Sequence, residues 1–329
     1  MNFELPLTKG DGMEIFMKIV FLDVASIGKD LDYSGFDRLG EVVKYDYTTP
    51  REMPERVADA DILVLNKMQV NEQTIGGAKK LKLVCVTATG TNNLDKEYLE
   101  KRGIAWRNVA GYSTETVAQH TFALLFYLME KMPYYDNYVK SEKYVDDRQF
   151  THFTNVFHEL NGKQWGIIGL GTIGKRVAQI AQCFGCKVVY YSTSGKNHDA
   201  DYEEVSFETL LKTSDIVSVH APLDENTKGL MNRQAFSQMK KEAFFINVGR
   251  GPIAVEEDLA SALEEGLIAG AGLDVLSEEP MRKDNPLRGI KDSGKLIITP
   301  HIAWASVEAR TRLLSIVCGQ IAEYENKTM

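Results

Sequence analysis

The feature that most constrains the fold is a regular alternation of short β-branched segments with amphipathic helical segments along almost the whole chain. The first strand candidates are residues 18–23, 42–46, 62–65, 83–87 and 104–108. A second series comprises residues 164–169, 187–192, 215–220, 243–248, 268–275 and 296–299. Strands that alternate with helices form βαβ units and a parallel sheet. Two series in 329 residues predict two Rossmann-like, doubly wound α/β domains, since a domain takes roughly 150 residues.

Helical candidates fill the gaps between the strands. They are residues 114–131, 173–183, 206–213, 227–240, 255–265 and about 305–325. The segment 114–131 is apolar nearly all round, which is typical of a buried helix, and Pro133 is expected to end it. Residues 134–157, which we call the aromatic arm, carry seven aromatic residues in 24. The aromatic arm could pack on its own domain, but aromatic side chains are enriched at interface cores, so we expect a homodimer contact.

The charge balance restricts the class of partner. The chain carries 38 Lys and Arg against 46 Asp and Glu, a net charge of −8, whereas nucleic-acid binding needs clustered basic residues. No apolar run reaches the roughly 18 residues of a membrane span. Residues 1–16 are polar, unlike a signal peptide, and four cysteines are too few for a disulfide framework. We therefore expect a cytoplasmic protein with neither a nucleic-acid nor a membrane partner.

A glycine-rich hexapeptide at residues 169–174 matches G-x-G-x-x-G, follows a strand candidate and opens a helix candidate. Gly169 would permit the tight turn, Gly171 would let the backbone approach a pyrophosphate, and Gly174 would let helix and strand pack closely. The N-terminus of the helix would then face the anion. The motif predicts a binding site for NAD(H) or NADP(H).

The next strand ends differently from most dinucleotide-binding sites. An acidic residue is expected about 20 positions after the glycines, where it bonds the adenosine ribose. Here that position is Ser192, and no acid follows before Asp199. Thr193, Ser194 and Lys196 could hold a 2′-phosphate, while Ser192 could bond the ribose of NAD(H). Both coenzymes therefore fit the sequence.

Three polar signatures follow strand candidates of the second series. Arg250 lies in Asn-Val-Gly-Arg-Gly, Glu279 stands directly before Pro280, and His301 follows Thr-Pro. In open α/β sheets, ligands bind at the carboxyl ends of the strands. Reduction of a ketone needs a proton donor, a cation that orients and polarises the oxo acid, and an acid that holds the donor protonated. His, Arg and Glu supply these three groups.

The chain resembles the D-isomer-specific 2-hydroxyacid dehydrogenases from about residue 18 to residue 325. The resembling segments are TATGTNNLD (87–95), STETVAQHTFALL (113–125), GIIGLGTIG (166–174), HAPLDENTKGL (220–230), INVGRGPIAVEEDLASAL (246–263), GLDVLSEEP (272–280) and PHIAWAS (300–306). The sequences of segments 113–125 and 300–306 are most similar to those of the glycerate dehydrogenase and hydroxypyruvate reductase branch. Ser192 in place of the usual acid and Gln119 in place of the frequent Glu depart from the family pattern.

The resemblance implies roles for individual residues. Arg250 would bind and polarise the 2-oxo acid, and Glu279 would pair with His301, the acid/base. The implied cofactor contacts, with those of the glycine loop, are Gly169, Gly171, Thr172, Ile173, Gly174, Ser192, Val248, Gly249, Arg250 and Asp274. The implied substrate contacts are Lys67, Thr89, Gly90, Thr91 and Arg250.

The resemblance also implies an organisation and a reaction. A catalytic domain would comprise residues 1–113 plus 302–329, and an NAD(P)-binding domain, residues 114–301, would be inserted in it, with the active-site cleft between them. The two subunits of a homodimer would meet through the NAD(P)-binding domain and the aromatic arm. The expected reaction is hydride transfer between NAD(P)H and a short 2-oxo acid, with hydroxypyruvate first and glyoxylate next.

Alternatives remain open at this point. Another D-2-hydroxyacid dehydrogenase, of the lactate or phosphoglycerate type, fits the same motifs, and so does a non-enzymatic dinucleotide-sensing protein of the same fold. The pair Cys183 and Cys186 forms a lone C-x-x-C without a second pair to complete a zinc site, so no metal is expected. His120 is expected to be structural, and His220 structural or on the cofactor side.

Overall fold

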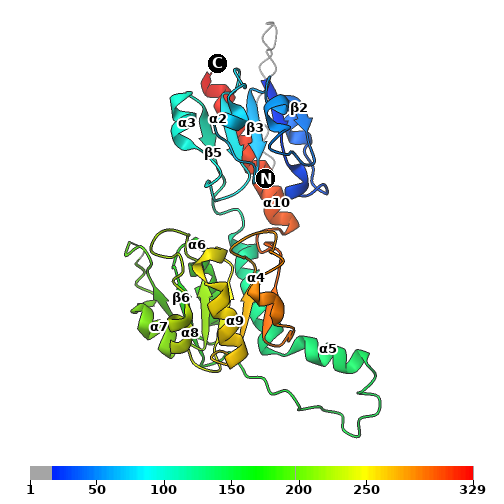
Figure 1. Ribbon diagram of the computed structural model, residues 1–329, viewed down its shortest axis with the longest axis vertical. Helices are drawn as coiled ribbons and strands as arrows, with labels where there is room; N and C mark the ends of the chain where they lie inside the picture. The colour runs from blue at the N-terminus through cyan, green and yellow to red at the C-terminus, as the bar shows by residue number, and fades with distance from the viewer. Residues whose placement is uncertain (1–16, 197, 329) are drawn as a thin grey trace. The chain divides into compact units, whose positions relative to one another are not determined.

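The computed structural model describes residues 17–196 and 198–328, and these residues form two compact units. One unit contains the described residues up to Tyr112 together with those from Val307 onwards, and the other spans Ser113–Ser306. Figure 1 shows a separate sheet in each unit. The polar segment 1–16 lies outside the described residues.

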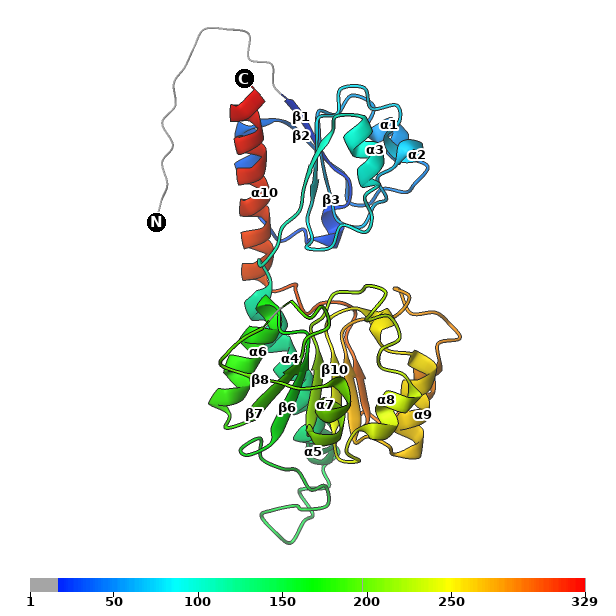
Figure 2. The same cartoon turned by 90° about the vertical axis from the view of Figure 1, so that its left-hand side faces the viewer.

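The first unit is built on a five-stranded parallel sheet of order β2-β1-β3-β4-β5. Its strands are β1 (Met17–Phe21), β2 (Gly40–Lys44), β3 (Ile62–Leu65), β4 (Leu83–Val86) and β5 (Ala105–Arg107). Its helices are α1 (Met53–Arg56), α2 (Glu72–Ile75), α3 (Lys96–Lys101) and α10 (Val307–Thr328), with short 3₁₀ turns at Val24–Ser26 and Ser34–Arg38. Helices α1–α3 lie on one side of the sheet and α10 on the other (Figure 2). Every residue of β3 and β4 is buried, as expected for parallel strands covered on both faces.

The second unit is built on a seven-stranded parallel sheet of order β12-β11-β10-β9-β6-β7-β8. Its strands are β6 (Gln164–Ile168), β7 (Lys187–Tyr191), β8 (Glu203–Glu204), β9 (Ile216–Val219), β10 (Phe244–Asn247), β11 (Gly270–Leu273) and β12 (Leu296–Ile298). Its helices are α4 (Thr114–Met129), α5 (Met132–Lys140), α6 (Thr172–Cys183), α7 (Phe207–Thr213), α8 (Arg233–Gln238) and α9 (Glu256–Glu265), with 3₁₀ turns at Gly251–Ile253 and Pro286–Gly289.

Two hydrophobic clusters cover the two faces of this second sheet. One cluster joins α4 and α6 to the strands, and the other joins α7, α8 and α9 to them. The strand order reverses at β6, because β7 lies on one side of β6 and β9 on the other. The prediction of two parallel-sheet α/β domains is thus confirmed. The reversal also matters for function, since ligands of open α/β sheets bind at such a switch point.

Two predicted helices differ from the observed ones. Pro133 does not simply end the long helix, because it lies in the first turn of a new helix, α5, which proline tolerates. The break is made by Lys131, whose φ of 55° is left-handed. The predicted helix 227–240 shrinks to α8, since Asn232 caps it at Ala235 and Thr227 is held in a preceding turn by Pro222 and Asp224.

The boundary near the C-terminus also differs from the predicted one. Residues 302–306, assigned from the sequence to the catalytic domain, belong to the second unit. The reason is packing, since Ala303 is buried and joins the hydrophobic cluster around α4 and α6, against which Trp304 also packs. Among the described residues, no helix is long and apolar enough to cross a membrane.

Candidate active site

The glycine loop between β6 and α6 uses each of its glycines for a different physical reason. Gly169 has a φ of 91°, and a Cβ there would stand 2.8 Å from the backbone of Ala221. A Cβ on Gly174 would collide with the carbonyl oxygen of Gly169, so this glycine lets α6 pack closely on β6. Gly171 has no heavy atom within 4 Å of the Cβ position. The backbone is therefore open to a ligand at Gly171, the residue that precedes the first turn of α6.

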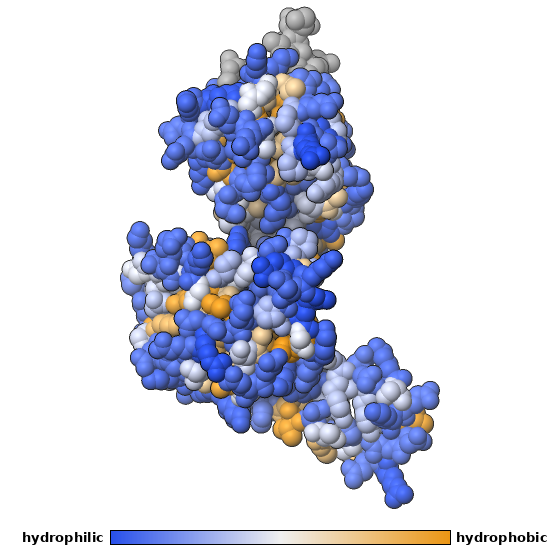
Figure 3. All heavy atoms as spheres, viewed as in Figure 1, coloured by the Kyte–Doolittle hydropathy of each residue, from blue (hydrophilic) through white to orange (hydrophobic). Residues whose placement is uncertain are grey.

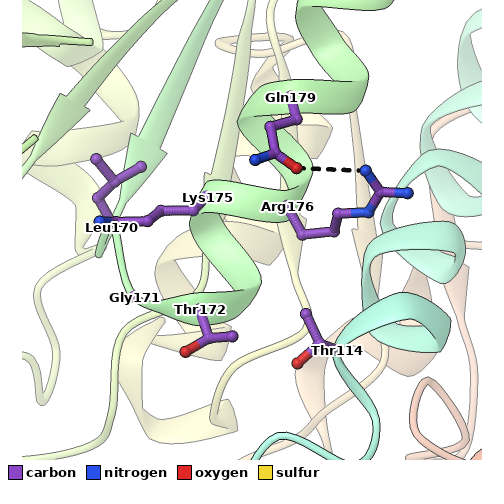
Figure 4. Close-up of a pocket in the computed structure, with 7 residues that line it drawn as sticks. All are labelled: Thr114, Leu170, Gly171, Thr172, Lys175, Arg176 and Gln179. Carbon is purple, nitrogen blue, oxygen red and sulfur yellow. Dashed lines mark hydrogen bonds between the residues drawn. The ribbon is translucent and has the colours of Figure 1, made fainter. Parts of the chain in front are cut away.

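A cavity of about 500 Å³ lies at this end of α6 (Figure 4). It is lined by Thr114, Leu170, Gly171, Thr172, Lys175, Arg176 and Gln179. Two of these residues are cations, and the N-terminus of a helix attracts anions through its unpaired N–H groups. The cavity suits a phosphate-bearing ligand, and Thr172 and Ile173 stand where the helix begins.

The end of β7 offers a hydroxyl where a carboxylate was expected. Ser192 is 8% exposed, and its Oγ has no hydrogen-bond partner in the part of the chain that the structure describes. A buried polar atom of this kind normally has a partner. A ligand that brings a hydroxyl to this atom would satisfy it.

Arg250 follows β10 at the carboxyl edge of the same sheet. Its guanidinium donates to the carbonyl oxygen of Gly249 at 2.8 Å, and its carbonyl accepts from the Asn247 amide at 3.0 Å. A Cβ on Gly251 would collide with the backbone of Leu276. The loop that carries Arg250 is therefore pressed against the loop that carries Glu279.

The preceding residues of this loop face the loop after β9. Val248 is buried, and a Cβ on Gly249 would stand 3.2 Å from the carbonyl oxygen of Ala221. Ala221 is also the residue that crowds Gly169. Val248 and Gly249 thus lie on the same stretch of the sheet edge as the glycine loop.

Glu279 joins two parts of the site through its two carboxylate oxygens. Oε1 accepts the N–H of Leu276 at 3.0 Å, and Oε2 lies 2.7 Å from Nδ1 of His301. The side chains of both residues are partly exposed. The structure thus brings together Glu279 and His301, 22 positions apart in the sequence, in one hydrogen-bonded pair.

Asp274 holds the turn in which His301 stands. Its carboxylate is 1% exposed and accepts the Thr299 hydroxyl at 2.6 Å and the N–H groups of Ile302 and Ala303 at 2.9 Å each. The N–H of His301 donates to the carbonyl oxygen of Asp274 at 2.8 Å. His301 has a left-handed φ of 55°, a conformation that costs a non-glycine residue energy. Asp274 therefore positions His301, and its predicted contact with the cofactor stays a prediction.

Two histidines gain a context that the sequence did not reveal. Nε2 of His120, on α4, lies 2.9 Å from the Thr299 hydroxyl and 3.6 Å from Asp274, so His120 packs beneath the turn of His301. His220 bonds the Ser218 hydroxyl at 3.0 Å, and burial lowers its pKa to about 3. His220 is therefore neutral near pH 7. His120 lies in a segment that resembled the family and Thr299 directly precedes another, which was the available signal.

Of the predicted substrate contacts, Arg250 lies in the second unit, and Lys67, Thr89, Gly90 and Thr91 lie in the first, on loops that are fixed locally. Asp23, which follows β1, is 6% exposed and accepts the N–H groups of Asn66 and Lys67 at 3.0 Å. The Thr89 hydroxyl donates to the carbonyl oxygen of Val109 at 3.0 Å. Gly90 and Thr91 follow in the same turn and are half-buried. Asp23 was not singled out from the sequence.

The second unit carries a histidine–carboxylate pair, and the loop of its carboxylate packs against the loop of a cation, Arg250. A histidine with a carboxylate on one ring nitrogen can hold and transfer a proton on the other. An arginine can bind a carboxylate and polarise a carbonyl. In the described parts of the chain, no three His, Cys, Asp or Glu side chains gather at a spacing that suits a metal ion.

Comparison with known proteins agrees with the chemistry that this geometry allows. Residues 122–303 match the model of the D-isomer specific 2-hydroxyacid dehydrogenase NAD binding domain. A hydroxypyruvate reductase of Blautia hydrogenotrophica is 38% identical over 315 residues, 94% of this chain and 97% of that protein. A glycerate dehydrogenase of Methylorubrum extorquens is 36% identical over 293 residues, 89% of this chain and 91% of that protein. An acyclic imino acid reductase solved with NADPH and D-arginine is 29% identical with a TM-score of 0.83, covering 94% of this chain and 98% of its own.

Proposed function

Because the chain belongs to the D-isomer specific 2-hydroxyacid dehydrogenase family, we propose that it reduces hydroxypyruvate to D-glycerate, with glyoxylate as a second substrate. The family is a class of NAD(P)-dependent oxidoreductases that act on 2-hydroxy acids and 2-oxo acids. Hydroxypyruvate reductase and glycerate dehydrogenase name the two directions of one reaction, and relatives of both names support this substrate pair.

The observation that carries the proposal is the hydrogen bond of 2.7 Å between Nδ1 of His301 and Glu279. Glu279 lies on a loop that packs closely against the loop of Arg250, because a Cβ on Gly251 would collide with the backbone of Leu276. A proton donor, its carboxylate partner and a cation thus follow strands β12, β11 and β10, which are neighbours in the sheet. A sensor protein needs no proton donor, so this arrangement favours an enzyme over the non-enzymatic alternative.

The residues of the second unit fit a nicotinamide dinucleotide. The open space at Gly171 admits a pyrophosphate to the N–H groups of Thr172 and Ile173, and the buried Ser192 hydroxyl can bond a ribose. When bound, the coenzyme supplies the hydride that adds to the carbonyl carbon of the oxo acid. The chain's own task is to bind the acid, polarise its carbonyl and move one proton.

His301 moves the proton and Arg250 prepares the carbonyl. Since Nδ1 of His301 is bonded to Glu279, the proton transferred to the substrate oxygen is held at Nε2. His301 would donate this proton to the substrate oxygen and be left as a neutral imidazole, while Arg250 would stabilise the charge that develops on that oxygen. We assign the binding of the substrate carboxylate to Lys67 and the turn 89–91 of the first unit.

Steady-state kinetics on a panel of 2-oxo acids tests the proposal. Hydroxypyruvate should give the highest kcat/KM, followed by glyoxylate, with pyruvate at least tenfold lower. The same panel with a His301→Asn preparation controls for contaminating reductases. A highest kcat/KM for pyruvate or for phosphohydroxypyruvate would instead assign the chain to the lactate or phosphoglycerate type.

We further propose that NADH and NADPH are both used, with kcat/KM values within about tenfold, or roughly 1.4 kcal/mol. The support is the hydroxyl of Ser192 where a carboxylate would repel a 2′-phosphate. The Ser192→Asp variant should lose NADPH activity selectively, and Ser237→Asp, which adds a carboxylate at an exposed position of α8, serves as its control. A thousandfold preference of the unmodified chain for NADH would contradict this proposal.

We also propose that the aromatic arm contacts a second copy of the chain. Its tyrosines are used internally: Tyr138 donates to Asp147 at 2.6 Å, and Tyr134 bonds His152 at 2.7 Å. In the view of Figure 3, hydrophilic side chains predominate over α5 and the loop that follows it, with a few hydrophobic ones among them. The apolar side chains of the aromatic arm are exposed, with Phe150 at 88% and Phe153 at 78%. Exposed apolar surface on this scale supports an interface. Phe150→Ser with Phe153→Ser should convert a dimer to a monomer in sedimentation analysis, and a monomeric unmodified chain would contradict the proposal.

A further inference from the structure

One ion pair beside the glycine loop has no part in the proposed mechanism. Lys175 follows Gly174 on α6 and lines the cavity with Gly171 and Thr172. Its Nζ lies 2.8 Å from the carboxylate of Asp199, whose side chain is mostly buried. Figure 4 shows Lys175 extending to the side of Leu170, opposite to Arg176. The pair thus joins the first turns of α6 to the loop that follows β7.

The position of Asp199 is fixed by the end of β7. Its N–H donates to the hydroxyl of Tyr190 at 3.1 Å, and its carboxylate accepts the N–H of Asp201 at 3.0 Å. Tyr190 stands two residues before Ser192, so the two side chains leave an extended chain on the same side. The Lys175–Asp199 pair therefore belongs to the same region as the buried Ser192 hydroxyl.

The other charged side chains of this loop either pair with groups other than Lys175 or are exposed. His198 lies 2.7 Å from the carboxylate of Glu204, to which Tyr190 also donates at 3.1 Å. Lys196 is exposed. Lys175 and Arg176 are the two cations that line the cavity of the glycine loop. Arg176 pairs with Glu115 on α4, whereas Lys175 pairs with Asp199 on the loop after β7.

The physical importance of this region lies in the 2′ position of the adenosine ribose. In dinucleotide-binding folds, the group at the end of the second strand reads either a 2′-hydroxyl or a 2′-phosphate. A carboxylate disfavours a 2′-phosphate through repulsion, and an ammonium favours it through attraction. This chain lacks the carboxylate at Ser192, but the loop that follows β7 carries Asp199, which pairs with Lys175 of α6.

We propose that Lys175 and Asp199 together set the coenzyme preference of this chain: Asp199 holds Lys175 when NAD(H) is bound, and the 2′-phosphate of NADP(H) replaces Asp199 as the partner of Lys175. The inference rests on the proposed use of both coenzymes and deepens it. Mutual hydrogen bonding lowers the pKa of Asp199 and raises that of Lys175, so both are charged at neutral pH.

Two single variants should shift the preference in opposite directions. Asp199→Asn leaves the charge of Lys175 unopposed and should tighten NADPH binding relative to NADH by about tenfold. Lys175→Met leaves Asp199 unopposed and should weaken NADPH relative to NADH by about tenfold. The double variant should return to within about threefold of the original ratio, since both charges are removed together.

Calorimetric titration of the full-length chain with NADH and with NADPH, without any oxo acid, measures this ratio. The result is therefore independent of whether hydroxypyruvate is the substrate. Lys196→Met is the control for the rival assignment, in which this lysine of the loop after β7 holds the 2′-phosphate. Lys212→Met controls for a lysine of an ordinary surface pair, with Glu208 on α7.

The expected outcome is opposite shifts in the two single variants and no shift beyond twofold in either control. The shifts should also shrink as salt is raised, because exposed charges are screened. Unchanged ratios in both single variants would overturn the inference. A shift with Lys196→Met but not with Lys175→Met would overturn it too and assign the 2′-phosphate to the loop lysine.

Discussion

The two sheets of this molecule share one structural feature at their carboxyl edges, a buried aspartate that accepts hydrogen bonds from the N–H groups of a neighbouring loop. In the first unit, Asp23 follows β1 and accepts the N–H groups of Asn66 and Lys67, which follow the adjacent strand β3. In the second unit, Asp274 follows β11 and accepts those of Ile302 and Ala303, which follow the adjacent strand β12. Each aspartate thus fixes a loop with a candidate site residue.

The difference between the two aspartates matches the difference in what their loops must do. Asp274 also accepts the Thr299 hydroxyl, and its loop holds His301 at a positive φ, which costs roughly 1–3 kcal/mol for a non-glycine residue. Asp23 holds Lys67 without such strain, and burial raises its pKa. The edge that we propose to handle a proton is fixed from more sides than the edge that we propose to bind a carboxylate.

The largest expected effect tests the proton-handling edge directly. His301→Ala should lower kcat for hydroxypyruvate by roughly 10²–10⁴-fold, because the general acid is lost, while NADH binding measured by titration stays unchanged. His158→Ala, an exposed histidine, is the matched control. Turnover close to that of the unmodified chain would remove His301 from the mechanism.

Glu279 allows a finer version of the same test. Glu279→Gln keeps the size of the side chain but removes the charge beside Nδ1 of His301. It should lower kcat by about tenfold or more, and its effect should disappear in the His301→Ala background, since coupled residues are not additive. Additive losses would mean that Glu279 acts without His301.

The next prediction concerns the buried aspartate of the second unit. Asp274→Asn puts an amide N–H₂ where N–H donors point, so it should reduce the free energy of unfolding by about 2 kcal/mol and lower kcat with it. Thr299→Val removes one hydrogen bond to the same carboxylate and should cost only about 1 kcal/mol. Urea unfolding of both variants measures the difference. Equal stability of Asp274→Asn and the unmodified chain would break the comparison between the two edges.

The fold was predictable because its signals are local. Residues 62–65 are apolar at every position and residues 216–219 at every position except Ser218, and strands buried on both faces belong to parallel sheets. The helix at 227–240 was overestimated because its limits depend on specific side chains. Asn232 caps α8 and Asp224 holds Thr227 in a turn, which apolar spacing cannot reveal.

Site residues were predictable only where each one lies within a short sequence motif. The pair of His301 and Glu279 followed from segments that resemble a known family. The pairs Asp23–Lys67, Lys175–Asp199 and His120–Thr299 join residues up to 179 positions apart, and no sequence spacing announces them. They arise because parallel strands place the ends of distant segments on one edge.

The third prediction tests whether Asp23 serves binding as Asp274 serves the proton donor. Asp23→Asn keeps one acceptor for the N–H groups of Asn66 and Lys67 and replaces the other with a donor. The loop should loosen, so KM for the oxo acid should rise about threefold to tenfold with kcat within twofold, and stability should fall by about 1 kcal/mol. A loss of stability with an unchanged KM would make Asp23 purely structural and leave the comparison valid only for the second unit.

The smallest expected effect is the pH dependence of the difference in stability between the unmodified chain and that variant. The sign of this dependence follows from the burial of Asp23. Burial raises the pKa of Asp23, and the N–H groups of Lys67 and Asn66 oppose the shift without cancelling it. Between the unfolded value, about 3.9, and the raised folded value, the folded chain binds more protons than the unfolded chain. Stability contributed by Asp23 is therefore highest at acid pH and falls as pH rises through this window.

Because Asp23→Asn cannot titrate at this position, the stability of the unmodified chain minus that of the variant should decline with rising pH just above pH 4 and then level off. Urea unfolding of both proteins in parallel at closely spaced pH values measures this difference and cancels the titration of all other groups. A difference that grows with pH would show that the N–H donors outweigh burial. Asp23 would then hold its loop as an ionised carboxylate with a net gain in stability, and the comparison between the two edges would rest on their hydrogen bonds and backbone conformation alone.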